Sequence, residues 1–257
     1  MVAAAVELKF DALAITDHDT LAGYRIAKPL AEAAGLRLLC GIELSTKIYE
    51  PPARRTVHLL AYFPGGEPSG TFCEWIAQMQ AARRDRNQRL AKRLQELGVD
   101  VRIEEVEALG KSMAGRPHFA RLMIQKGYVQ TSTEAFDRYL DESAPGYVDR
   151  EEPSLEEAIG KVRAAGGVSS LAHPVRLGKR NHAEEEALIA TVVSMGLSAI
   201  EAYHSDHSPP DVQRYLKIAG KYGLKVTGGS DFHGDNKPSV RLGQANVPTT
   251  LLDALSQ

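Results

Sequence analysis

Histidine and carboxylate side chains gather where short apolar segments of this chain end. Such segments are followed by Asp17-His18-Asp19, Glu43, His173, His204-Ser205-Asp206-His207 and Asp231-Phe232-His233, and His58 lies within a further apolar segment, 56–63. Because the carboxyl ends of parallel strands form one face of an α/β fold, we expect these side chains to meet there. Imidazole mixed with carboxylate suits zinc, manganese or iron, so the pattern predicts a divalent metal site.

A structural role for each histidine is the alternative to this interpretation. A lone histidine is more often a core or surface residue than a ligand, and an Asp-x-His triplet occurs often by chance. In an extended segment, however, Asp231 and His233 point to the same side. The preceding Gly228-Gly229-Ser230 allows a tight turn. Five apolar segments that end in this way favour a shared site over five separate structural roles.

Arg116-Pro117-His118 is a second candidate, away from the apolar segments. A guanidinium matches phosphate oxygens, and a histidine can add a donor or a proton. The alternative is a helix start with proline in its first turn and an arginine on the surface. The local sequence alone favours neither interpretation.

Other chemistries lack their sequence patterns. Gly228-Gly229-Ser230 is not a G-x-S-x-G nucleophile turn, and neither a G-x-G-x-x-G nor a Walker A pattern occurs. Cys40 and Cys73 cannot form a CxxC zinc site. The basic segment 83–93 could contact RNA, although a solvated helix face is the commoner role of such a segment.

Composition limits the partners that we expect. The formal net charge is −2, so no global basic field points to a DNA partner. Apolar runs are too short to span a bilayer, which takes about 20 residues. The first ten residues, MVAAAVELKF, do not resemble a signal peptide. We therefore expect a cytoplasmic protein.

Strand and helix patterns alternate on both sides of a helical region. Strands are predicted at 12–16, 36–42, 56–63, 168–172, 197–203 and 224–227, with helices at 21–34, 155–165, 183–195 and 210–222. Such βα units predict a parallel sheet, open or closed into a barrel. Residues 1–64 and 151–257 form the expected core. Residues 65–150 are expected to form a mainly helical insert, with a long helix at 75–97 and one further strand at 99–103.

The motifs together resemble those of the PHP (polymerase and histidinol phosphatase) family of metal-dependent phosphoesterases. The matching segments are DALAITDHDTLAGY, GIELS, VHLLAYF, GRPHFARLM, LAHP, IEAYHSDH and GGSDFHG, which span about residues 11–234. The nearest subgroup acts on nucleoside 3′,5′-bisphosphates and overlaps with a 5′→3′ exoribonuclease type. The resemblance implies a distorted (βα)7 barrel with a helical insert.

The resemblance also implies roles for particular residues. It implies up to three divalent metals (Mn, Zn, Fe or Mg), with the ligands His18, Glu43, His58, His173, Asp231 and His233. Arg116 and His118 match the phosphate-binding element of the insert, and His204 matches a residue that lines the substrate pocket. Asp17 is expected to support a ligating histidine.

One family motif is absent. The family pattern begins with an H-x-H on the first strand, and no histidine precedes Asp17 here. Residues 2–8 are helix-forming without an N-cap, so the chain is expected to begin inside a helix and to lack that strand.

The leading functional hypothesis is hydrolysis of a nucleotide phosphate ester by metal-activated water. Glu43 would bridge metals, Asp231 would be essential for turnover, Arg116 would hold phosphate oxygens, and His204 or His207 would contact substrate and protonate the leaving group. The substrate would be a bisphosphate nucleotide or the 5′ end of short RNA. A degenerate, non-catalytic protein that binds a nucleotide or a partner is the alternative, favoured by the absent H-x-H.

Overall fold

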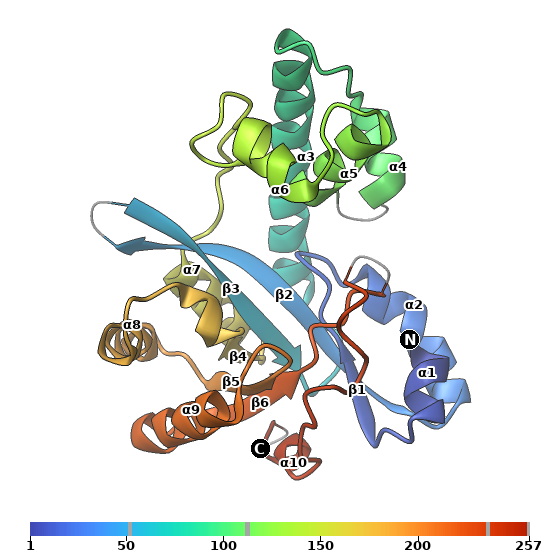
Figure 1. Ribbon diagram of the computed structural model, residues 1–257. Helices are drawn as coiled ribbons and strands as arrows, with labels where there is room; N and C mark the ends of the chain where they lie inside the picture. The colour runs from blue at the N-terminus through green and yellow to red at the C-terminus, as the bar shows by residue number, and fades with distance from the viewer. Residues whose placement is uncertain (51–52, 111–113, 235–236, 256–257) are drawn as a thin grey trace. The chain divides into compact units, whose positions relative to one another are not determined.

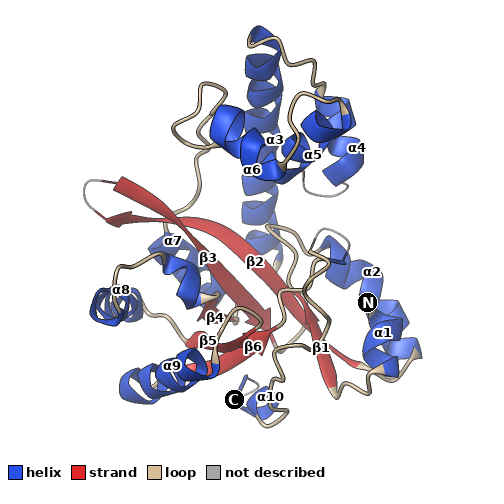
Figure 2. Cartoon of the chain, in the orientation of Figure 1, coloured by secondary structure: helices blue, strands red, loops and turns tan. Residues whose placement is uncertain are grey.

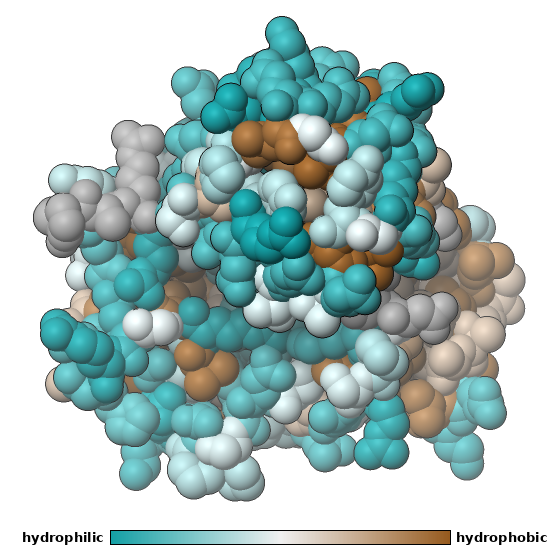
Figure 3. All heavy atoms as spheres, turned by 45° about the horizontal axis from the view of Figure 1, so that its top comes forward, coloured by the Kyte–Doolittle hydropathy of each residue, from teal (hydrophilic) through white to brown (hydrophobic). Residues whose placement is uncertain are grey.

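The computed structural model describes residues 1–50, 53–110, 114–234 and 237–255. The chain divides into two compact units. The barrel unit consists of Met1–Phe72 and Pro153–Gln257, and the helical unit of Cys73–Glu152. Among the described residues, no helix combines the length and apolar character needed to cross a membrane. The face seen in Figure 3 is mostly hydrophilic, with separate hydrophobic patches.

A curved six-stranded sheet forms the centre of the barrel unit (Figures 1 and 2). Its strands lie side by side in the order of the sequence. They are β1 (Ala12–Ile15), β2 (Arg37–Glu50), β3 (Ala53–Phe63), β4 (Val168–Leu171), β5 (Ala199–His204) and β6 (Lys225–Gly229). The predicted α/β fold of a distorted barrel is thus confirmed.

The all-parallel sheet expected from the strand–helix rhythm is wrong for β3. β3 runs antiparallel to both β2 and β4, whereas the β1–β2, β4–β5 and β5–β6 pairs are parallel. Only two residues separate β2 from β3, and Glu50 pairs with Ala53. So short a connection permits a hairpin and excludes the crossover that parallel strands need. As hairpin arms, β2 and β3 both extend beyond the predicted 36–42 and 56–63.

Helices cover the strands of the barrel unit. α2 (Ala22–Ala33) packs against β1 and β2, α7 (Leu155–Ala164) against β2, β3 and β4, and α9 (Pro209–Tyr222) against β5 and β6. The described residues of this unit also form α1 (Val2–Glu7), η2 (Pro174–Leu177), α8 (His182–Ser194) and α10 (Leu251–Leu255).

Side-chain caps fix the starts of three of these helices. The Ser154, Asn181 and Ser208 side chains accept hydrogen bonds from backbone N–H groups three residues later, at α7, α8 and α9. Such caps satisfy donors that have no partner within the helix.

The helical unit has its own apolar core. Its elements are α3 (Gly70–Glu96), α4 (Ile103–Gly110), α5 (Arg116–Gln125), α6 (Ser132–Ala135) and η1 (Phe136–Leu140). Leu94, Phe119 and Met123 are fully buried in this core. The strand expected at 99–103 is not formed: Val99 and Val101 are buried in the same core, and α4 begins at Ile103.

Candidate metal centre

Two histidine rings lie beside one carboxylate oxygen of Glu43. Its Oε1 lies 2.8 Å from His58 Nδ1 and 3.2 Å from His173 Nε2, and the two nitrogens are 3.2 Å apart. Ligands about 2.0–2.1 Å from a tetrahedral metal are about 3.3 Å from one another. The three atoms therefore have the mutual spacing of ligands on one metal ion, and their chemistry fits a divalent metal.

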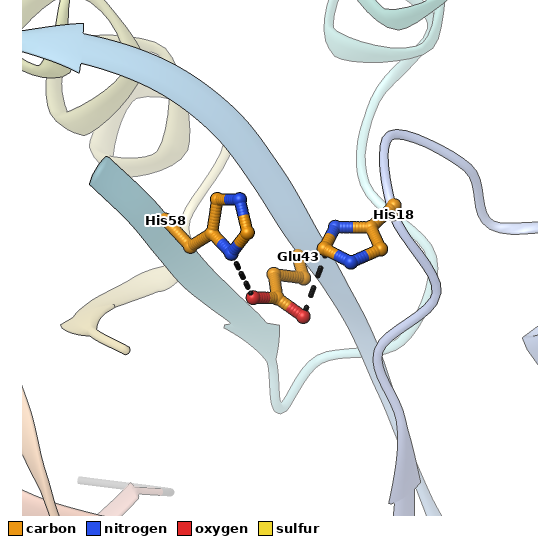
Figure 4. Close-up of side chains that lie close together, drawn as sticks. All are labelled: His18, Glu43 and His58. Carbon is orange, nitrogen blue, oxygen red and sulfur yellow. Dashed lines mark ion pairs between the residues drawn. The ribbon is translucent and has the colours of Figure 1, made fainter. Parts of the chain in front are cut away.

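The other oxygen of Glu43 faces His18, whose Nδ1 lies 3.8 Å from Oε2 (Figure 4). Ligand atoms of His18, Glu43 and His58 all lie within 4.8 Å of one another. One carboxylate thus presents its two oxygens to histidines on two sides, which is the arrangement that a bridging carboxylate needs.

Backbone pairing holds His18 beside Glu43. The Glu43 N–H donates to Asp17 O at 3.1 Å, and the Asp19 N–H donates to Glu43 O at 2.8 Å, which continues the β1–β2 ladder past the end of β1. Asp19 is fully buried, and its Oδ1 accepts a 2.7 Å hydrogen bond from the Ser45 N–H. Glu43 itself lies within β2 rather than at the strand end where the sequence placed it, because β2 continues to Glu50.

Asp231 lies at the centre of a second polar cluster. Its Oδ2 accepts hydrogen bonds from Arg176 Nη2 at 2.9 Å and from Lys237 Nζ at 3.0 Å, and lies 3.7 Å from His204 Nε2. His233 Nδ1 lies 3.4 Å from Asp231 Oδ1, so the two side chains are neighbours as expected, although Asp231 has a φ of 54° and the segment is not extended.

Imidazole rings connect the two clusters. Ring centroids are 6.3 Å apart for His233 and His18, 4.9 Å for His18 and His58, 5.2 Å for His58 and His173, and 5.7 Å for His173 and His204. The structure thus gathers all six predicted ligands with His204. Whether they bind metal stays a prediction.

A cavity of about 840 Å³ lies beside these clusters. Among the predicted site residues, it is lined by His18, Glu43, His173, His204, Asp231 and His233. The space is sufficient for a small ligand, since ligand pockets usually measure about 300–1,000 Å³.

Glu201 is a site residue that the sequence analysis missed. It is 4% exposed, lines the cavity, and accepts a 2.7 Å hydrogen bond from the backbone N–H of His173. His173 has a φ of 28°, in the region that non-glycine residues rarely adopt. Glu201 therefore helps to hold a strained backbone at a predicted ligand. A charged residue within the apolar segment LSAIEAY was the available signal, because carboxylates are seldom buried without a partner.

The carboxyl groups of the site differ in acidity. Burial would raise the pKa of Glu43, but the charge of His18 and hydrogen bonds from His173 and His58 hold it well below its usual value. Burial raises the pKa of Glu201 well above its usual value, and the nearby charges of Glu43 and Asp231 add to this. Burial also opposes the ionisation of Asp231, yet the nearby His204 and the hydrogen bond from Lys237 lower its pKa. Glu43 and Asp231 thus have the ionised form that metal ligands need.

His204 and His207 are placed differently. The Asp206 N–H donates to His204 Nδ1, so the proton of the neutral ring lies on Nε2, facing Asp231. His207 lies behind His204, with Nδ1 2.8 Å from Ala202 O and its ring 4.8 Å from that of Tyr215, and it is not among the residues that line the cavity. Its predicted role in substrate binding stays a prediction that this position does not favour.

The remaining predicted residues have local hydrogen-bond partners. The Asp17 carboxylate accepts a hydrogen bond from the Gly23 N–H at the start of α2. Arg116 and His118 belong to the first turn of α5 in the helical unit, where His118 Nδ1 accepts a 3.0 Å hydrogen bond from the Gly115 N–H. Burial lowers the pKa of His118, as do the charges of Arg121 and Arg83.

Curated proteins similar in sequence to this chain include a phosphatase and an exoribonuclease. No protein-family model matches the chain. It is 30% identical over 224 residues to a 3′,5′-nucleoside bisphosphate phosphatase of Chromobacterium violaceum, covering 86% of this chain and 76% of the relative. It is 30% identical over 250 residues to the 5′-3′ exoribonuclease Rnm of Escherichia coli, covering 95% of this chain and 82% of the relative.

A solved structure shares the fold. A protein of Bifidobacterium adolescentis, provisionally named a metal-dependent phosphoesterase, superposes with a TM-score of 0.82 at 31% identity and covers 99% of this chain and 88% of its own. The shared fold, the extent of the similarity and the histidine–carboxylate site agree with one another. The chain therefore belongs to the PHP family of metal-dependent phosphoesterases and is a phosphoric ester hydrolase.

Proposed function

We propose that this hydrolase removes a phosphate group from nucleoside 3′,5′-bisphosphates. The observation that carries the proposal is the triangle of Glu43 Oε1, His58 Nδ1 and His173 Nε2, with edges of 2.8, 3.2 and 3.2 Å. The similarity to a bisphosphate phosphatase supports the substrate class.

The six predicted ligands would hold the metals. Glu43 with His18, His58 and His173 forms one group, and Asp231 with His233 the other. Manganese, zinc, iron or magnesium is compatible with this set, with up to three ions. When bound, divalent metals lower the pKa of water and neutralise charge on phosphate.

The other polar residues would position the substrate. Arg176 and Lys237 bring two positive charges to the Asp231 cluster, where they can also attract phosphate oxygens. His204 lines the cavity with its Nε2 proton facing Asp231, which makes it the proposed donor of a proton or hydrogen bond. Arg116 and His118 are the proposed phosphate contacts of the helical unit.

Trimming of RNA from the 5′ end is the second candidate, because the chain also resembles an exoribonuclease. The basic helix α3 gives it little support. Arg84 pairs with Glu107 at 2.8 Å, and Arg89 pairs with Asp85 at 2.9 Å. Since carboxylates neutralise these two exposed arginines, both are less available to a phosphate backbone.

The test compares substrates and variants in the full chain supplied with manganese. Adenosine 3′,5′-bisphosphate should release phosphate with a higher kcat/KM than a 5′-phosphorylated oligonucleotide, and the reverse order would make the exoribonuclease activity the principal one. His58→Gln should abolish both activities. His182→Gln is the matched control because His182 is exposed at the start of α8. Full activity of His58→Gln would contradict the site assignment.

A further inference from the structure

Arg176 connects the loops that follow three neighbouring strands. It lies in η2, after β4, and donates hydrogen bonds to Asp206 after β5 and to Asp231 after β6. Its Nε donates to Asp206 Oδ2 at 2.8 Å, and its Nη2 donates both to the same oxygen and, at 2.9 Å, to Asp231 Oδ2. One guanidinium is thus divided between two carboxylates, of which only Asp231 is a predicted metal ligand.

Hydrogen-bond donors surround the oxygen of Asp231 that Arg176 contacts. This Oδ2 accepts from Arg176 Nη2 and, at 3.0 Å, from Lys237 Nζ, and His204 Nε2 lies 3.7 Å away. A carboxylate oxygen has two lone pairs, so the two cations use both of them. A metal ion can therefore bind this oxygen only if one of the two donors moves away.

Asp206 provides a second acceptor for the same guanidinium. Its Oδ2 already accepts from two nitrogens of Arg176, and its Oδ1 accepts no hydrogen bond from any residue that the structure describes. A guanidinium pairs most strongly with a carboxylate when two N–H groups meet its two oxygens. Arg176 can therefore leave Asp231 and keep a strong pair with Asp206.

The charges of these side chains favour the same movement. Asp206 and Asp231 carry two negative charges, and Arg176 and Lys237 carry two positive charges. Without the charge of Asp206, both cations would be left to Asp231 and would outweigh the charge of its carboxylate. A carboxylate compensated in this way attracts a divalent cation less strongly. The charge of Asp206 thus keeps Asp231 available to a metal ion.

We propose that Asp206 is a positioning residue that holds Arg176 back from Asp231 and so strengthens the binding of a metal ion there. The inference rests on the proposed function for the role of Asp231 as a metal ligand. Asp206 acts through Arg176, because this guanidinium lies between the two carboxylates. The effect concerns the affinity for the metal, so it can be observed without substrate or hydrolysis.

The test measures the Kd of each manganese ion by calorimetric titration of the full chain after treatment with a chelator and dialysis. Asp206→Asn keeps the shape of the side chain and the backbone N–H that donates to His204 Nδ1, and it removes the charge. Arg176→Met removes the guanidinium, and a double variant carries both changes. Asp206→Glu, which keeps the charge, is the matched control.

Asp231→Asn identifies the manganese ion of this cluster, because it should raise the Kd of that ion more than the Kd of any other. We expect Asp206→Asn to raise the same Kd about fivefold, since Arg176 then pairs with Asp231 alone. Arg176→Met should lower this Kd, because a competitor for the Asp231 oxygen is gone. In the Arg176→Met background, Asp206→Asn should have a clearly smaller effect. Asp206→Glu should bind manganese as wild type does.

Equal effects of Asp206→Asn in wild type and in Arg176→Met would overturn the proposal, because substitutions that act independently are additive. An unchanged Kd in Asp206→Asn would overturn it as well. If Asp206→Asn does not fold, Asp206→Ser replaces it in the same set of variants.

Failure of this inference can be told apart from failure of the proposed function. Weaker manganese binding in Asp231→Asn, with equal effects of Asp206→Asn in both backgrounds, would keep Asp231 as a ligand and refute the role of Asp206. The predicted dependence on Arg176, without hydrolysis of nucleoside 3′,5′-bisphosphates, would uphold the role of Asp206 and refute the proposed function.

Discussion

Replacing His207 by asparagine should weaken the dependence of stability on pH. His207 is 9% exposed, donates from Nδ1 to Ala202 O, and has a buried Nε2 with no hydrogen-bond partner among the described residues. Burial lowers its pKa from 6.5 to about 4, despite the opposing hydrogen bond to Ala202. Asparagine can still donate to Ala202 O but cannot take up a proton.

The lowered pKa of His207 determines whether stability rises or falls with pH. As the pH falls below 6.5, the unfolded chain binds a proton at this histidine that the folded chain excludes until about pH 4. Stability is therefore lost as the pH falls through this window. Between pH 7.5 and pH 5 the loss from His207 is about 2 kcal/mol, and for a chain of this size it lowers Tm by about 4–8 °C.

The assay is thermal and urea unfolding at pH 7.5 and at pH 5, with wild type and His207→Asn measured in the presence of a chelator. Other titrating groups contribute equally to both proteins, so the difference between their pH responses isolates His207. Equal responses of the two proteins would refute the reasoning. An unchanged pH response together with a raised KM would instead support the predicted role of His207 in substrate binding.

Three further changes test other parts of the structure. Asp231→Asn should lower kcat more than a hundredfold while the protein stays folded, and an unchanged kcat would remove Asp231 from the site. Glu201→Gln keeps an oxygen acceptor for the His173 N–H and should retain more activity than Glu201→Ala, as kcat measurements can show; equal losses would contradict the positioning role. Ser208→Ala removes the cap of α9 and should lower the free energy of unfolding by about 1 kcal/mol in urea titrations, whereas no change would mean that the cap contributes nothing.

The fold was predictable where local sequence determines it. Short apolar segments alternating with helical patterns placed β1, β4, β5 and β6 and the helices between them close to their observed positions. The direction of β3 was not predicted, because it depends on a two-residue connection rather than on the pattern within the strand. The strand predicted at 99–103 is not formed. Val99 and Val101 alternate with polar residues as in a strand because both valines are buried in the core of the helical unit.

The site was predictable in its residue types and less so in its contacts. Functional side chains were expected to meet at the carboxyl ends of the strands. This expectation named His18, His173, Asp231 and His233, which the structure brings together. Arg176 and Lys237 were not predicted, since single basic residues in loops carry no signal until the fold places them at Asp231.

The most direct test of the metal centre is elemental analysis of the full chain after dialysis against metal-free buffer. We predict that wild type and His182→Gln retain more than one divalent transition metal per chain and that Glu43→Gln loses most of this metal, because Glu43 presents an oxygen to histidines on each side. Wild type without metal, or Glu43→Gln with the same metal content as wild type, would contradict the account.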